Sequence, residues 1–442
     1  MAGIVERIPQ DLREVFGSVS DELGRSTGFI KRTRAFSGAD FVRALVFGWL
    51  SCARATIEDL ADRLGITASA LQQRLTKEAS EFLRLAFENA LNRMLGSRNV
   101  RIPLLAKFTA VHVEDCTTIS LPAEMEDEFR GCGGSDEESG KAALRLFTSY
   151  ELKTGTLRQV AAAEARGPDS TVAHKHAPEL PRGALRIRDL GFFDRQLFEK
   201  DRKAGIHWIS RVPAGVTVRD SDGSSVQISQ FLANQPSTTN SIDCWMYVGQ
   251  ADHGTKPLHC RLIAVRCPPE VAARRRQKLL EAARRKGRTA SQRQLLMCDW
   301  TVLITTVPED MLTIAEAWEL YCARWQIELL FKRWKSLGGL QVSTNMKRDR
   351  VLCELYAKLL GMLVAHWFTL IRGGPLEGFS LKKAIKKIKG MADRLADALR
   401  WPERLAAVIA EIAAKMHRIP KQPRRKKQPS TRQRLFHPRL AI

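Results

Sequence analysis

The sequence lacks several features that would place a protein in a familiar class. It has nine cysteines but no Cys-x-x-Cys pair, so neither a disulfide framework nor a zinc ribbon is indicated. Residues 1–18 mix charged and apolar side chains without the apolar core of a signal peptide. The longest mostly apolar stretch, Leu359–Ile371, is too short to cross a bilayer. We therefore expect a protein of the reducing cytoplasm in which this stretch is a buried helix.

Acidic residues are scarce relative to basic ones. The chain of 442 residues carries 71 Lys and Arg against 48 Asp and Glu, a formal charge of +23, while 44% of its residues are hydrophobic. A large folded protein this basic usually meets a polyanion, because neutralising phosphates releases their counterions. Nucleic acid is the expected partner, and the alternative is a generally basic surface of the kind found on ribosome-associated proteins. The length predicts two to four domains.

The first part of the chain has a helical pattern. Within it, Thr56–Leu75 has the small residue, turn glycine and core leucine of a helix-turn-helix at Ala61, Gly65 and Leu71. Thr67 or Ser69 is expected to cap the second helix. The functional interpretation is a helix that enters the major groove of DNA, and the alternative is an ordinary helical hairpin.

A different pattern begins at residue 108. Short β-rich runs end at Glu114-Asp115 and at Asp189, and others follow at 206–212, 226–265 and 300–306. The segment 272–293 is very basic, with Glu281 as its one acid. Helical pattern resumes at 313–335 and 350–371. Residues 421–434 are basic and interrupted by proline, which predicts disorder.

The predicted helix at 313–335 carries a polar stripe. Tyr321, Arg324, Glu328 and Lys335 fall within an arc of roughly 60° at about 100° per residue. An apolar face lies beside them. A solvent-facing ladder of ion pairs is the alternative interpretation, but it does not account for a tyrosine in this register.

Two aspartates add to this stripe. Asp115 and Asp189 each follow a predicted strand, so their carboxylates can converge with one from a packed helix. Three acids without His or Cys suit Mg²⁺ or Mn²⁺. Two such ions about 3.5–4 Å apart support in-line phosphoryl transfer. Glu114 and Asp194 compete for these roles, and spacing alone does not choose between the acids.

At this point the sequence resembles the DDE transposases of bacterial insertion sequences. The segment YCARWQIELLFKRWK, Tyr321–Lys335, has the complete Tyr-x2-Arg-x3-Glu-x6-Lys spacing of one branch of that family. The segments DCTT at Asp115 and DLGFF at Asp189 are similar to its two aspartate motifs, in the same order. The resemblance covers roughly residues 105–370.

The resemblance implies roles for individual residues. The catalytic metal ligands would be Asp115, Asp189 and Glu328, which leaves Glu114 and Asp194 with structural roles. Tyr321, Arg324 and Lys335 would hold DNA phosphates, and Lys332, one helical turn before Lys335, is expected to help. Apart from the resemblance, Arg211 is a weaker candidate for a DNA contact, and ordinary basic surface is the favoured alternative there. Trp300 would stack on a flipped-out base, and the alternative is a core tryptophan.

The resemblance also implies a fold and a reaction. The fold would be α/β, with an RNase H-like catalytic core at 105–212 and 309–372, a β-rich insertion at 213–308, a helical DNA-binding region at 1–104, and a helical C-terminal region with a basic disordered tail at 373–442. Two Mg²⁺ or Mn²⁺ ions would support excision and insertion through a hairpin end.

The implied partners are the terminal inverted repeats and target DNA, bound by a homodimer near the bacterial nucleoid. Two alternatives belong to other classes. One is a non-catalytic DNA-binding protein derived from a transposase, which would be expected to have lost a carboxylate. The other is an RNase H-like nuclease that cuts without strand transfer.

Overall fold

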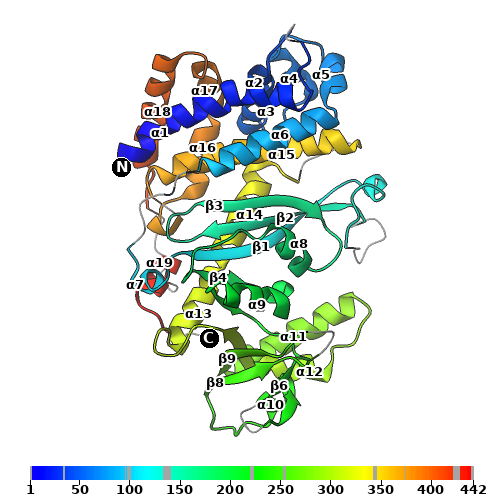
Figure 1. Cartoon of the computed structure of the whole chain (residues 1–442), viewed down its shortest axis with the longest axis vertical. Coiled ribbons are helices and arrows are strands. Elements are labelled where there is room, and N and C mark those ends of the chain that lie inside the picture. The colour runs from blue at the N-terminus through cyan, green and yellow to red at the C-terminus, as the bar shows by residue number, and fades with distance from the viewer. Residues whose placement is uncertain are drawn as a thin grey trace.

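The structure is a computed structural model that describes residues 2–32, 35–94, 96, 101–132, 141–219, 223–251, 255–341, 346–373, 375–421 and 429–439. Figure 1 shows a helical layer at the top, a layer of strands in the middle, and a mixed region of strands and helices at the bottom. The N-terminal and C-terminal regions of the chain both contribute helices to the upper layer.

The N-terminal region is helical, as its pattern predicts. Its helices are α1 (Ala2–Val15), α2 (Ser18–Ser26), α3 (Gly38–Ser51), α4 (Ile57–Asp62), α5 (Ala68–Arg74), α6 (Lys77–Asn92) and the short α7 (Pro103–Ala106). The Thr67 hydroxyl caps α5 by accepting a hydrogen bond from the backbone of Ala70. Gly65 has a φ of +65°, which permits the tight turn between α4 and α5. Leu71 of α5 is buried.

Ten strands of the described part of the chain form one sheet in the order β3-β2-β1-β4-β5-β10-β9-β8-β6-β7. They are β1 (Val111–Ser120), β2 (Ala143–Glu151), β3 (Leu157–Glu164), β4 (Leu185–Arg188), β5 (His207–Ser210), β6 (Thr217–Arg219), β7 (Ser225–Gln227), β8 (Ser241–Val248), β9 (Leu258–Arg266) and β10 (Trp300–Thr305). β4 is parallel to β1 and to β5, and the other pairings are antiparallel. The protein is therefore mixed α/β with helical regions at both ends, as expected.

The segment 213–308 extends this sheet, because β10 pairs with β5 through Ile304 and Ser210. Its apolar side chains, among them Leu262 and Trp300, form a hydrophobic cluster together with Trp208 of β5. Three helices accompany its strands: α10 (Ile228–Ala233), α11 (Pro269–Arg285) and α12 (Gln292–Leu296), the last followed by the 3-10 turn η3 (Met297–Asp299).

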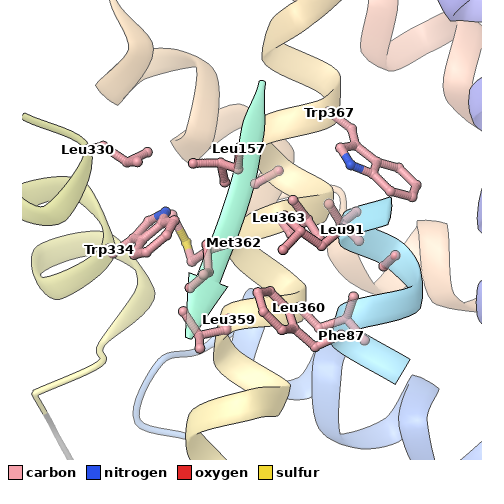
Figure 2. Close-up of a cluster of buried hydrophobic side chains, with 14 of the residues drawn as sticks. Phe87, Leu91, Leu157, Leu330, Trp334, Leu359, Leu360, Met362, Leu363 and Trp367 are labelled. Carbon is pink, nitrogen blue, oxygen red and sulfur yellow. The ribbon is translucent and has the colours of Figure 1, made fainter. Parts of the chain in front are cut away.

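The longest helix of the described residues is α15 (Arg348–Leu370), with 23 residues. It has the length and hydropathy of a membrane span, but almost all of that apolar window is buried inside the protein. Figure 2 shows Leu360 and Leu363 of α15 beside Phe87 and Leu91 of α6, with Trp334 of α14 on the other side. Burial of each such side chain contributes about 1.5–3 kcal/mol. The prediction of a buried helix is confirmed.

The C-terminal region is helical and reaches back to the sheet. Its elements are η4 (Pro375–Glu377), α16 (Leu381–Lys389), α17 (Ala392–Ala398), α18 (Pro402–His417) and α19 (Thr431–Phe436). The structure differs here from the predicted disorder of 421–434. Ser430 and Gln433 form a capping box, Leu435 is buried, and Arg434 pairs with the buried Glu319 at 2.6 Å. Residues 422–428 of that segment lie outside the described residues.

Candidate functional site

The first carboxylate is carried by β1. The sequence predicts that Asp115 follows this strand, but the structure places it within the strand. The reason is that β2 continues to pair with β1 as far as Ser120. The parallel pairing with β4 ends earlier, at Glu114 and Arg188. Asp115 and Asp189 are the next residues on these two strands, so the end of the parallel ladder places the two aspartates side by side.

Asp189 directly follows β4 and caps the 3-10 turn η2 (Leu190–Phe192). Its carboxylate accepts a hydrogen bond from the backbone of Leu190 at 2.7 Å, which fixes the start of the turn. The competing acid, Asp194, caps α9 (Arg195–Lys203) by accepting hydrogen bonds from Gln196 and Leu197. The geometry gives Asp194 a structural task.

The third carboxylate lies on a helical segment that is divided in two. The sequence predicts one helix over 313–335, whereas the structure has α13 (Ile314–Ala323) and α14 (Trp325–Gly338), with Arg324 at the junction. Hydrogen bonds that span three residues, from Arg324 to Tyr321 and from Ile327 to Arg324, tighten the chain there. Tyr321, Arg324 and Glu328 still face the strands, as the stripe predicts.

Arg324 joins the three acids. Its guanidinium lies 2.8 Å from Asp115 and 2.6 Å from Glu328, and 3.6 Å from Asp189. Its Nε is buried and has no hydrogen-bond partner among the described residues. The Tyr321 hydroxyl donates a hydrogen bond to Asp189 at 2.8 Å. Side chains of the polar stripe on α13 and α14 therefore meet the two aspartates at the Arg324 guanidinium.

The electrostatic environment separates the two aspartates. Burial raises the pKa of Asp115 to about 7, although Arg324 opposes this shift. Burial acts in the same direction on Asp189, but Arg324 and the hydrogen bonds from Leu190 and Tyr321 leave its pKa below the usual value. Burial also raises the pKa of Tyr321 and lowers that of Lys335.

A cleft of about 520 Å³ opens beside these groups. Its wall includes Asp115 and Glu328, but not Asp189. The other lining residues are Cys116, Thr117, Phe331, Lys332, Lys335, Ser336 and Gln341. Lys332 is exposed and Lys335 half-buried. The cleft thus has carboxylates at one end and two amines from the next turns of α14, a combination suited to a cation and a phosphate together.

The two remaining predicted residues lie in different surroundings. Arg211 is exposed just after β5, and its charge contributes to the lowered pKa of Asp189. Trp300 is only 2% exposed and packs in the hydrophobic cluster of 213–308, with the Arg266 guanidinium 4.3 Å from its ring centroid. The ring is buried in this conformation, and the stacking of Trp300 on a base stays a prediction.

A buried ion network lies behind the site, and its partners were not anticipated from the sequence. Glu114 pairs with Arg186 and with Arg188, and Arg188 also contacts Asp201 of α9 at 2.9 Å. All four side chains are buried. The alternation of arginine with apolar residues in Leu185–Arg188 is the signal that could have revealed it. The network fixes β1 and β4 together at the register of the two aspartates.

The donor set fits a hard divalent cation, because three carboxylates offer only oxygen ligands. The described residues contain no group of His, Cys, Asp or Glu already arranged as a metal site. The Arg324 guanidinium lies among the three carboxylates and offsets only part of their negative charge.

The fold and the site define an α/β protein in which two aspartates at the end of a parallel ladder meet a glutamate from a helix, beside a cleft that also contains two lysines. Residues 110–363, more than half of the chain, match the family described as the Transposase DDE domain. The chain belongs to this family of DDE transposases, which confirms the resemblance at that level.

Relatives support the same assignment. The chain is 26% identical over 370 residues to the transposase for insertion sequence element IS231F of Bacillus thuringiensis subsp. israelensis, covering 78% of this chain and 76% of the relative. It is 25% identical to the transposase for IS1151 of Clostridium perfringens, with the same two coverages. It is 27% identical to the putative transposase InsL for IS186A of Escherichia coli strain K12, over 50% of this chain and 60% of that protein.

Proposed function

We propose that the chain moves an insertion sequence by cutting and rejoining DNA at Asp115, Asp189 and Glu328. The observation that carries this proposal is the convergence of the three carboxylates on Arg324, at the end of a cleft that also contains Lys332 and Lys335. Family membership supplies DNA as the substrate, and the net charge of +23 suits it.

The proposed core is RNase H-like and comprises residues 105–212 and 309–372. The strand order β3-β2-β1-β4-β5, with an antiparallel meander followed by two parallel strands, supports it. The insertion at 213–308 would add its strands to the edge of this core through β10. The region 1–104 would read DNA through α5, whose exposed side chains include Ser69, Gln72 and Gln73.

The cofactor would be Mg²⁺ or Mn²⁺, two ions held by Asp115, Asp189 and Glu328. Such ions supply activation of the attacking oxygen and stabilisation of the leaving oxygen in phosphoryl transfer. The protein contributes the fixed positions of the carboxylates. Asp115 must be ionised to serve, so its raised pKa makes the site sensitive to pH near neutrality.

Tyr321, Arg324, Lys332 and Lys335 would hold the phosphates of the element end. Arg324 would exchange the carboxylates for a phosphate when the site is loaded, and its unpartnered Nε offers a further donor. Burial lowers the pKa of Lys335 and so disfavours its charged form, and a nearby phosphate would favour the charged form again. Arg211 would extend this basic edge beside Asp189.

Tyr321 is proposed as a phosphate ligand and not as a nucleophile. Burial and the neighbouring Asp189 raise the pKa of its hydroxyl, so the phenolate that would attack phosphorus is disfavoured. The attacking groups would be water and the 3′-hydroxyl of DNA. Each step would be a direct displacement at phosphorus, and the cut end would pass through a hairpin. The active form would be a homodimer in the bacterial cytoplasm. A stacking role for Trp300 would require its ring to leave the core.

The test is cleavage of a labelled linear DNA that carries the terminal repeat found beside the gene, with Mg²⁺. We expect wild type to release the end, and Glu328→Gln to bind the same DNA but cut it slower by about 10²–10³-fold or more. Glu199→Gln is the matched control, because Glu199 forms surface ion pairs with Arg202 and Lys203, away from the carboxylate site. Equal cutting by wild type and Glu328→Gln would contradict the assignment of the third carboxylate.

A further inference from the structure

Helix α11 and the segment that follows it carry a concentration of charge that the proposed site does not use. Residues 269–293 contain nine Lys and Arg against two Glu. Ala272 is the one fully buried residue of α11. This helix lies at the lower right of Figure 1, beside the strands of the insertion.

Two of the arginines attach α11 to the sheet. Arg275 donates hydrogen bonds to the Trp300 carbonyl at 3.1 Å and to the Thr301 hydroxyl at 2.9 Å. Arg276 pairs with Asp299 at 2.5 Å. The first turns of α11 are therefore fixed to the start of β10, and the remaining cations project from a rigid base.

The attachment places α11 at the edge of the sheet that holds the carboxylates. Ser210, the last residue of β5, pairs with Ile304 in the antiparallel β10. Trp300 therefore lies beyond the carboxyl end of β5, in the direction in which β4 reaches Asp189. Because α11 is tied to Trp300, it leaves the sheet at this same edge.

The projecting cations form what we call the basic ridge, which consists of Arg274, Lys278, Arg284, Arg285, Lys286, Arg288 and Arg293. All seven are exposed, and none has an ion pair with any residue that the structure describes. Arg274, Lys278 and Arg285 fall within about 40° on the helix and span about 16 Å. Glu281 lies in the same stripe, where Gln277 donates a hydrogen bond to it.

A ridge of this kind suits a regular array of negative charges. Two of its arginines lie in the last turn of α11 and stabilise the helix dipole, but that accounts for only part of the charge. The remaining like charges repel one another unless a polyanion lies against them. The length of the stripe is enough to reach both strands across a DNA groove about 12 Å wide.

We propose that the basic ridge binds the phosphate backbone of duplex DNA that runs outside the catalytic cleft. This proposal rests on the proposed function, because the DNA is the substrate of the carboxylate site. It adds a DNA-contact surface on the insertion to the two proposed above, which are the helical region at 1–104 and the cleft cations. Contacts of this type contribute affinity without sequence preference.

The test uses the full chain and a random-sequence duplex of about 40 base pairs, with affinity measured between about 50 and 200 mM salt. The variant Arg274→Gln/Lys278→Gln/Arg285→Gln removes three charges and keeps good helix formers. A second variant, Arg274→Lys/Lys278→Arg/Arg285→Lys, keeps the charges. A third, Lys382→Gln/Lys383→Gln/Lys386→Gln, removes three exposed charges from α16 instead. Equal melting temperatures would show that all three variants fold.

We expect the first variant to reduce the slope of log affinity against log salt by about 2–3, because each lost phosphate contact removes about 0.9. Its deficit would then shrink roughly 40-fold across that salt range. The charge-keeping variant should match wild type, and the α16 variant should lose less. An unchanged slope in the first variant, or equal losses from α11 and α16, would overturn the proposal. If wild type binds no duplex at all, the proposed function itself fails.

Discussion

The two faces of β1 hold neighbouring carboxylates in opposite states. Glu114 is fully buried between Arg186 and Arg188, whose charges outweigh the effect of burial and keep its pKa below the usual value. Asp115, the next residue, shares one arginine with two other acids, and burial raises its pKa to about 7. One face has an ion network of two acids and two arginines, and the other has three carboxylates that share one arginine.

This difference teaches how a strand supports a reactive site. The Glu114 network has two arginines for two acids, so its charges are balanced within the protein. The Asp115 site has three acids for one arginine and remains short of positive charge. In the proposed function a divalent cation would supply the positive charge that the second face lacks, while the ion pairs of the first face join β1 and β4.

The largest expected effect comes from Glu114→Gln, which leaves two buried arginines with insufficient negative charge. We expect it to lower the free energy of unfolding by about 3–5 kcal/mol, because removal of one partner from a buried ion pair exposes the full desolvation cost. Denaturant unfolding without metal measures it. Asp189→Asn, on the partly exposed face, should change stability by about 1 kcal/mol or less. Similar losses in both variants would remove the contrast between the faces.

The exchangeable role of Arg324 predicts an effect of the opposite sign on metal affinity. Arg324→Ala should bind Mn²⁺ about tenfold more tightly in the absence of DNA, because the competing cation is gone. It should also bind duplex DNA more weakly. Titration of Mn²⁺ followed by electron paramagnetic resonance measures the first effect, with Lys332→Ala as the control that leaves the carboxylates paired. Weaker Mn²⁺ binding by Arg324→Ala would refute the exchange.

A smaller effect is expected from pH. Folding raises the pKa of Asp115 to about 7, so the stability linked to its proton is present at low pH and is lost as the pH rises through that value. A bound cation favours the ionised form and recovers this loss. Mn²⁺ should therefore raise the melting temperature by a few degrees more at about pH 8 than at about pH 6. Asp115→Asn should abolish this pH dependence, and a larger shift at the lower pH would contradict it.

The sequence was informative where a local pattern determined the result. The spacing of Tyr321, Arg324 and Glu328 predicts the stripe without knowledge of the fold, and the apolar run of α15 predicts burial. Thr67 and Gly65 predict a cap and a turn that the structure contains. Each of these depends on residues a few positions apart.

The rest depends on contacts between distant segments. The sequence around Asp115 does not indicate that pairing with β2 extends β1 beyond this residue. It also does not indicate that the Asp115 carboxylate accepts a hydrogen bond from Arg324, 209 positions away in the sequence. Helix α19 is held by an ion pair between its Arg434 and Glu319, which is far away along the chain. Trp300 at the start of a strand is compatible with either a surface or a core position, and only the packing around Leu262 and Arg266 distinguishes them.

The most direct test of the account is Mn²⁺ binding by Asp189→Asn beside Asp194→Asn, without DNA. The two aspartates lie five positions apart, and the structure gives only Asp189 a place at the Arg324 cluster. We expect Asp189→Asn to weaken Mn²⁺ binding by at least about tenfold, while Asp194→Asn binds like wild type and loses only some helix stability. Wild-type Mn²⁺ affinity in Asp189→Asn would contradict the central claim that these three carboxylates form the metal site.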